Sequence, residues 1–76
     1  MEQIRSVFAE VFRCDPATVN ESSSPAEIEG WDSFGHLALI EALQSEFKVT
    51  FETGDIAQLD SVGQIQRILA LRGAQT

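Results

Sequence analysis

The stretch that organises this chain reads EGWDSFGHLALIEAL and covers residues 29–43. Asp32 is of a residue type that commonly caps helix N-termini. The apolar side chains that follow recur at the spacing of a helix with one buried face, at Phe34, Leu37, Ile40, Leu43 and Phe47. The pattern predicts a helix over residues 33–47 whose first turn carries Ser33. Because unpaired N–H groups and the helix dipole favour negative charge there, that serine is well placed for an anionic group such as a phosphate.

Three further helices are predicted around this one. The first covers residues 2–13 and rests on an apolar stripe with helical spacing, made by Ile4, Val7, Phe8, Val11 and Phe12. Residues 53–58 favour a short helix, and an Asp-Ser cap predicts a last helix over residues 61–71. Residues 48–51 are rich in β-formers, but the segment is too short and has no partner strand, so we expect a loop.

A long connection, residues 14–32, separates the first two helices. Asp15-Pro16 is expected to end the first helix, because the residue before a proline is pushed out of the α region. Loops of this length are usually functional or partly ordered. The apolar residues expected to anchor it on the core are Val19, Ile28 and Trp31, and residues 25–28 suggest a single helical turn.

The predicted fold is therefore one all-α domain over residues 1–76. It is a small four-helix bundle with three main helices, one short helix and a long first loop. With 43% hydrophobic residues the chain has enough apolar side chains for a core.

The charge of the chain is uneven. Of the net charge of −7, residues 15–60 contribute ten acidic side chains against Lys48 alone. Nucleic-acid binding is disfavoured, because neutralising phosphates requires a basic surface. A negative field centred on the serine and its helix favours docking to basic partner surfaces. The alternative is that the acidic surface only keeps a small protein soluble.

We expect neither a membrane span nor an export signal in this sequence. No apolar run is long enough to span a bilayer, and the N-terminus does not have the form of a signal peptide. The single cysteine, Cys14, excludes an internal disulfide and fits a reducing compartment. We expect a cytoplasmic monomer without membrane insertion.

Asp32, Ser33 and His36 lie within five residues and invite comparison with a hydrolytic triad. No oxyanion hole, substrate pocket or G-x-S-x-G elbow accompanies them, so an autonomous hydrolase is disfavoured. His36 is expected at the surface or its boundary, near the serine. One histidine and one cysteine cannot make a structural zinc site, and no calcium or Gly-rich phosphate loop is present. The chain is not expected to be an enzyme or to bind a metal.

Several side chains on adjacent turns of the central helix form a candidate partner surface. They are Phe34, Leu37, Ala38 and Glu41, which lead away from Ser33 as an apolar and acidic strip. The alternative interpretation places Phe34 and Leu37 in the core.

Three segments resemble the family of acyl carrier proteins and their peptidyl and aminoacyl relatives. The central one is WDSFGHL at residues 31–37, preceded by IEG at residues 28–30 and followed by LQSEF at residues 43–47. The resemblance extends over nearly the whole chain, since the order of helices and the long first loop also agree. It implies a carrier-protein-like helical bundle.

The resemblance implies that Ser33 receives a 4′-phosphopantetheine arm from coenzyme A, added by a separate phosphopantetheinyl transferase. Asp32 matches the aspartate that precedes the family's serine. Phe34 departs from the family pattern, where leucine or methionine is usual, and this larger ring puts the choice of transferase or partner in doubt. The arm's thiol would hold acyl or aminoacyl groups as thioesters for acyl-loading and acyl-transfer enzymes.

Partner enzymes with basic docking surfaces would then contact Glu41, Glu46 and Asp55, with short-range apolar contact at Phe34 and Leu37. We expect a free-standing carrier. Carriers of this kind serve fatty-acid, polyketide, nonribosomal-peptide and specialised pathways. Residues 31–37 depart from the common fatty-acid form, which favours a specialised pathway.

A rival hypothesis makes the chain a small acidic helical adaptor that docks one protein partner without a prosthetic group. In that case Ser33 is only a helix cap, and partner binding survives Ser33→Ala. Binding would fail instead when the charges of Glu41 and Glu46 are reversed.

Overall fold

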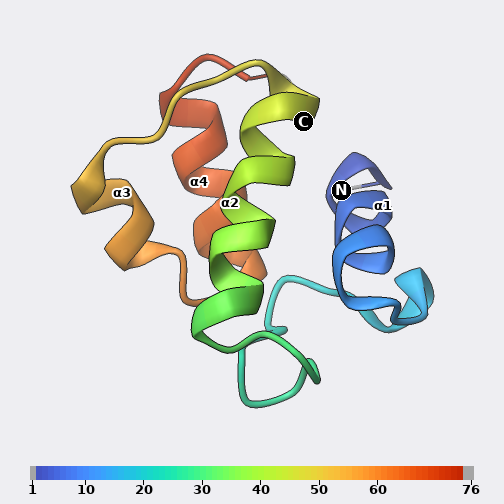
Figure 1. The fold of residues 1–76 in the computed structure, drawn as a ribbon. Coiled ribbons are helices and arrows are strands. Elements are labelled where there is room, and N and C mark those ends of the chain that lie inside the picture. The colour runs from blue at the N-terminus through green and yellow to red at the C-terminus, as the bar shows by residue number, and fades with distance from the viewer. Residues whose placement is uncertain (1, 75–76) are drawn as a thin grey trace.

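The computed structural model describes residues 2–74 and is all-helical over that range, as predicted (Figure 1). Its elements are α1 (Glu2–Phe12), the 3-10 turn η1 (Pro16–Thr18), α2 (Ser33–Phe47), α3 (Thr53–Gln58) and α4 (Val62–Leu71). α2 stands at the centre, with α1 on one side and α3 and α4 on the other (Figure 1). None of the helices in the described range is long and apolar enough to cross a lipid bilayer.

The core lies where α1, α2 and α4 face one another. Its fully enclosed side chains are Ile4, Phe8, Val19, Leu39, Leu43, Leu59, Val62, Ile65 and Leu69. Each large apolar side chain buried in this way stabilises the fold by roughly 1.5–3 kcal/mol. The anchors predicted for the long loop are confirmed, because Val19, Ile28 and Trp31 are all buried.

The first helix ends one residue earlier than predicted and for a different reason. Arg13 adopts a left-handed backbone conformation, with φ of 56°, directly after α1. This reversal ends the helix before the chain reaches Asp15-Pro16. Asp15 instead begins η1, where its carboxylate accepts a hydrogen bond from the backbone N–H of Ala17 at 2.9 Å.

The long loop is tied to the helices on both sides. The Arg5 guanidinium of α1 donates to the Val19 carbonyl at 2.9 Å. Two backbone N–H groups at the start of α4, those of Val62 and Gly63, donate to the carbonyls of Ser23 and Glu21. Such N–H groups have no acceptor within their own helix, so the loop satisfies them. The loop is therefore a fixed part of the fold, and it delivers Ser33 to a defined place.

The buried face of α2 differs from the stripe predicted by sequence. Leu39, Ile40 and Leu43 are buried, whereas Phe34 and Leu37 are exposed. The predicted stripe is confirmed at Ile40 and Leu43 and wrong at Phe34 and Leu37. Apolar residues lie on several faces of this helix, so their spacing alone did not select the face against which α1 and α4 pack. Phe34 and Leu37 therefore remain on the exposed surface of α2.

Candidate functional site

Ser33 is the first residue of α2, and its side chain is exposed. Asp32 caps the helix as predicted: its carboxylate accepts from the N–H of Gly35 at 3.0 Å, and its carbonyl accepts from that of His36 at 2.7 Å. The N–H groups of Ser33 and Phe34 also belong to the helix start and have no acceptor within the helix. An anionic group at the Ser33 hydroxyl would meet these donors and the positive end of the helix dipole.

Two glycines allow the loop to press directly on this first turn. Gly30 has a φ of 92°, a backbone conformation that residues with a Cβ atom rarely adopt. At Gly35 a Cβ atom would collide with the Gly30 carbonyl oxygen and would lie 2.8 Å from Cε1 of Phe12. The close contact between loop and helix thus requires glycine at position 35, and it fixes where Ser33 stands.

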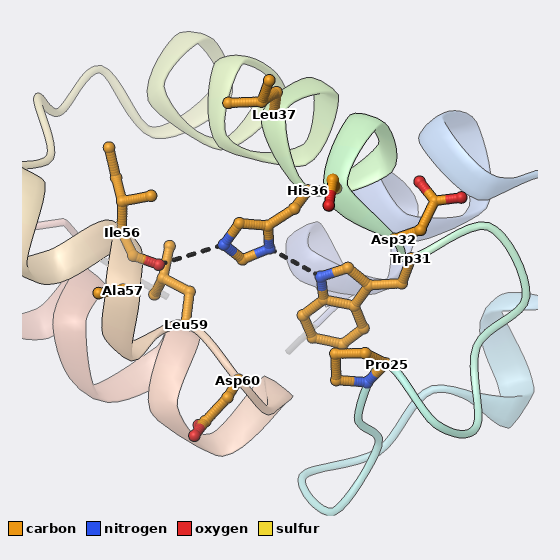
Figure 2. Close-up of a pocket in the computed structure, with 10 residues that line it drawn as sticks. Pro25, Trp31, Asp32, His36, Leu37, Ile56, Ala57, Leu59 and Asp60 are labelled. Carbon is orange, nitrogen blue, oxygen red and sulfur yellow. Dashed lines mark hydrogen bonds between the residues drawn. The ribbon is translucent and has the colours of Figure 1, made fainter.

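A histidine joins three parts of the site. The indole Nε1–H of Trp31 donates to Nδ1 of His36 at 2.8 Å, and the planes of the two rings are 15° apart. A neutral imidazole that accepts at Nδ1 carries its proton on Nε2. His36 Nε2 lies 3.1 Å from the Ile56 carbonyl oxygen at α3 and donates to it (Figure 2). The half-buried His36 therefore lies at the surface boundary near the serine, as predicted, but both its ring nitrogens are used within the fold.

An open cavity of about 590 Å³ lies beside Ser33, between the loop, α2 and the end of α3. Its lining is mostly apolar and comprises Pro25, Trp31, Asp32, Ser33, His36, Leu37, Ile56, Ala57, Leu59 and Asp60. Sequence reasoning missed the contributions of Pro25, Ile56, Ala57, Leu59 and Asp60. They are distant from Ser33 in sequence, and only the packing of α3 beside α2 brings them to the site.

The predicted partner strip on α2 is exposed. Phe34 is 86% exposed and Leu37 60%, and Ala38, Glu41 and Glu46 are also exposed. The alternative interpretation, in which Phe34 and Leu37 belong to the core, is wrong. A large apolar side chain exposed to this extent, next to the exposed Ser33, is a feature expected of an interaction site.

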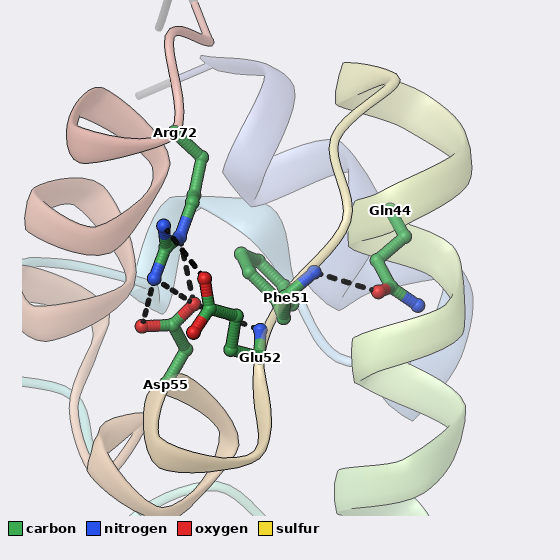
Figure 3. Close-up of polar contacts among 5 residues, drawn as sticks. All are labelled: Gln44, Phe51, Glu52, Asp55 and Arg72. Atoms are coloured by element: carbon green, nitrogen blue, oxygen red, sulfur yellow. Dashed lines mark hydrogen bonds and ion pairs between the residues drawn. The ribbon is translucent and has the colours of Figure 1, made fainter.

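Asp55 does not belong to this surface, which corrects the sequence prediction. It is only 8% exposed, and its carboxylate accepts two hydrogen bonds from the Arg72 guanidinium, at 2.8 and 2.9 Å (Figure 3). It also accepts from the backbone N–H of Glu52 at 2.9 Å, which completes a capping box at the start of α3. Its charge is paired with Arg72 inside the fold, so it cannot contribute to a partner surface.

These contacts perturb both groups of the pair. The hydrogen bonds from Arg72 and from the Glu52 backbone hold the pKa of Asp55 below its ordinary value of 3.8. The same hydrogen bond raises the pKa of Arg72. Both groups therefore remain charged at neutral pH.

Comparison with known proteins agrees with this geometry. A family model described as a phosphopantetheine attachment site matches residues 2–69. The chain belongs to this family of carrier proteins. It is 30% identical over 80 residues to acyl carrier protein 3 of Ralstonia nicotianae, an alignment that covers all of this chain and 92% of the relative. The solution structure of the holo acyl carrier protein from Geobacter metallireducens superposes with a TM-score of 0.81 at 27% identity, over 95% of this chain and 86% of that one.

The protein is thus a carrier rather than an enzyme, and phosphopantetheine is its prosthetic group. The residues around α2 fit such a group. An exposed serine hydroxyl stands at a capped helix start with N–H donors beside it, and a cavity opens next to it. Membership in this family also favours the carrier over the adaptor hypothesis.

Proposed function

We propose that the phosphopantetheine arm is attached to the hydroxyl of Ser33 by a phosphopantetheinyl transferase that uses coenzyme A. The observation that carries the proposal is the exposed position of Ser33 in the first turn of α2, directly after the capping residue Asp32. When bound, the arm supplies a thiol that holds acyl or aminoacyl groups as thioesters.

Within the chain, Asp32 and Ser33 have separate tasks. Asp32 engages the N–H of Gly35 and thereby holds the first turn in place. Ser33 makes no contribution to that cap, so its hydroxyl is free for modification while the helix stays intact. The N–H groups at the helix start lower the energy of negative charge at this hydroxyl.

We further propose that partner enzymes bind along the strip formed by Phe34, Leu37, Ala38, Glu41 and Glu46. The exposed ring of Phe34 lies next to the attachment residue, so a transferase that reaches Ser33 must also cover it. The carboxylates of Glu41 and Glu46 would attract basic docking surfaces from a distance. Such contacts are weakened by salt and release readily, which suits a carrier that visits several enzymes.

The test locates the modification. Wild type, Ser33→Ala and Ser45→Ala are each incubated with coenzyme A and a transferase of broad specificity, digested, and mapped by mass spectrometry. Ser45 is the matched control, because it is an exposed serine on the same helix. Modification of the peptide that contains residue 33 in wild type and Ser45→Ala supports the proposal. Modification of Ser33→Ala at another residue would refute it.

A further inference from the structure

A second hollow lies where α1 packs beside α2, on the side of α2 that faces away from α3 (Figure 1). It has a volume of about 160 Å³ and is lined by Val7, Glu10, Val11, Ala42, Ser45 and Glu46. Within the described part of the chain, it shares no lining residue with the cavity beside Ser33. The hollow is therefore a separate feature of the surface.

The floor of this hollow is apolar. Val7 is only 5% exposed, and Val11 and Ala42 are partly buried against the core. The methylene groups of a long side chain would cover this floor and leave water as they do so. The floor therefore favours a side chain with an apolar stem.

The rim of the hollow is acidic. Glu10 from α1 and Glu46 from α2 both line it, and both are exposed. Over residues 2–74 both ion pairs are made by Arg72, so neither of these carboxylates has a cation of its own there. Two carboxylates that share one hollow repel each other, which does not help the isolated fold. A cation placed between them would relieve the repulsion.

The size of the hollow limits its occupant. Pockets for small molecules usually have about 300–1,000 Å³, whereas the volume here corresponds to roughly five water molecules. One long side chain fits such a space. An arginine matches both of its parts, because its stem suits the apolar floor and its planar guanidinium presents N–H donors to two carboxylates and to the Ser45 hydroxyl.

The charge of the chain indicates where this arginine comes from. The net charge is −7, so two copies of the chain repel each other. A different protein with a basic surface is attracted by the same field. The charge therefore favours a basic partner protein over a second copy.

We propose that the hollow between α1 and α2 is a docking site for an arginine side chain of a partner protein, held between Glu10 and Glu46. The site brings α1 into the partner surface. It rests on the proposed strip of α2 only through Glu46, which gains a specific contact in addition to long-range attraction. It does not require a modified Ser33, so the unmodified protein can be used to test it.

The experiment follows the backbone amide signals of the unmodified protein by NMR while an acetylated and amidated Ala-Arg-Ala peptide is added. We expect saturable shifts at the residues that line the hollow, with low affinity because exposed ion pairs contribute little. The same peptide with citrulline, which keeps the shape but lacks the charge, should leave these signals in place. Shifts that spread over all acidic residues without saturation would overturn the proposal.

Three variants locate the contact. Glu10→Gln and Glu46→Gln should each weaken binding of the arginine peptide by about two- to fivefold, the effect of losing one exposed ion pair. Glu41→Gln is the matched control and should bind as wild type does, because Glu41 is an exposed acid of α2 that does not line the hollow. The NMR spectrum itself shows that each variant is folded. Equal weakening in all three variants would indicate net charge and refute a defined site.

Two further titrations separate other occupants. A peptide with lysine in place of arginine should bind more weakly, because an ammonium group lacks the planar fork of donors. Equal binding would mean that the hollow accepts any cation and would overturn the assignment to arginine. Shifts of the same signals as the protein's own concentration rises, without peptide, would assign the hollow to a second copy and overturn the proposal of a separate partner.

The outcome is distinct from that for the strip at Phe34 and Leu37. That strip is tested with a transferase, whereas the hollow is tested with peptides on the unmodified protein. Absence of saturable binding here would refute the arginine site and leave the strip standing.

Discussion

Asp55 and Arg72 form an ion pair with two hydrogen bonds that ties the first turn of α3 to the end of α4 (Figure 3). α3 carries no long apolar face of its own, and only six residues make it up. Its position beside α2 therefore depends on such contacts, together with the insertion of Leu59 into the core. Because α3 supplies one wall of the cavity at Ser33, this pair supports the site from a distance.

The first prediction concerns pH. The pKa of Asp55 is lowered in the folded protein, so the folded state holds the proton less tightly than the unfolded chain does. The pair's contribution to stability is therefore complete above the ordinary pKa of 3.8 and is lost as the pH falls through the lower, folded value. Asp55→Asn should lower the urea midpoint at pH 7 and flatten its dependence on pH below about 4.

The matched control for this prediction is Glu52→Gln. Glu52 also approaches Arg72, at 3.3 Å, but its side chain is 74% exposed. Exposed pairs of this kind contribute little, so the midpoint should hardly move. If the urea midpoint fell equally in Asp55→Asn and Glu52→Gln, the buried carboxylate of Asp55 would have no special role.

The second prediction concerns the contact between loop and helix. Gly35→Ala should destabilise the protein by about 1–3 kcal/mol, because the added methyl group collides with the Gly30 carbonyl and with Phe12. Gly54→Ala is the control: a Cβ atom there has open space around it, and replacing a helical glycine should stabilise by about 0.5–1 kcal/mol. Urea unfolding of both variants measures the difference. An unchanged unfolding free energy in Gly35→Ala would contradict the close approach of the Gly30 carbonyl to position 35.

The third prediction concerns the bridge at His36. Trp31→Phe keeps an aromatic ring against Phe8 but removes the donor to His36 Nδ1. Loss of this hydrogen bond from a half-buried acceptor should cost about 1–3 kcal/mol of unfolding free energy. The change is followed by circular dichroism, since the variant has no tryptophan emission. An unchanged unfolding free energy would mean that water replaces the indole without loss.

The fourth prediction concerns partner recognition. Phe34→Ala should change the unfolding free energy by less than about 0.5 kcal/mol, because the ring is exposed, yet it should raise the transferase KM. The double change of Glu41 and Glu46 to lysine should raise that KM by about tenfold at low salt, and the effect should fade as salt is added. Glu2→Lys, an exposed acid on α1, is the control and should have no effect. If Glu2→Lys raised the KM as strongly as the double change does, net charge rather than a defined surface would be responsible.

The sequence predicted those features that depend on local chemistry. The cap by Asp32, the helix start at Ser33 and the last helix capped by Ser61 follow from residue types and spacing, and the structure confirms them. The features that it could not predict depend on packing between distant segments. The spacing of α2 left open whether Leu37 lies in the core or points to solvent, and nothing in the sequence pairs Asp55 with Arg72, seventeen residues away.

His36 shows the same limit within the site. Its spacing from Ser33 placed it near the serine, which the structure confirms. Its two hydrogen bonds, however, go to Trp31 in the loop and to Ile56 at α3. The second partner becomes adjacent only when α3 folds back beside α2, so the role of this residue as a bridge required the structure.

The most direct test of the account is the intact mass of the protein after incubation with coenzyme A and a phosphopantetheinyl transferase. We expect wild type to gain one phosphopantetheine per chain and Ser33→Ala to gain none, while both unfold at the same urea concentration. Absence of any gain in wild type, with a control carrier modified in the same tube, would contradict the account, and so would a full gain in Ser33→Ala.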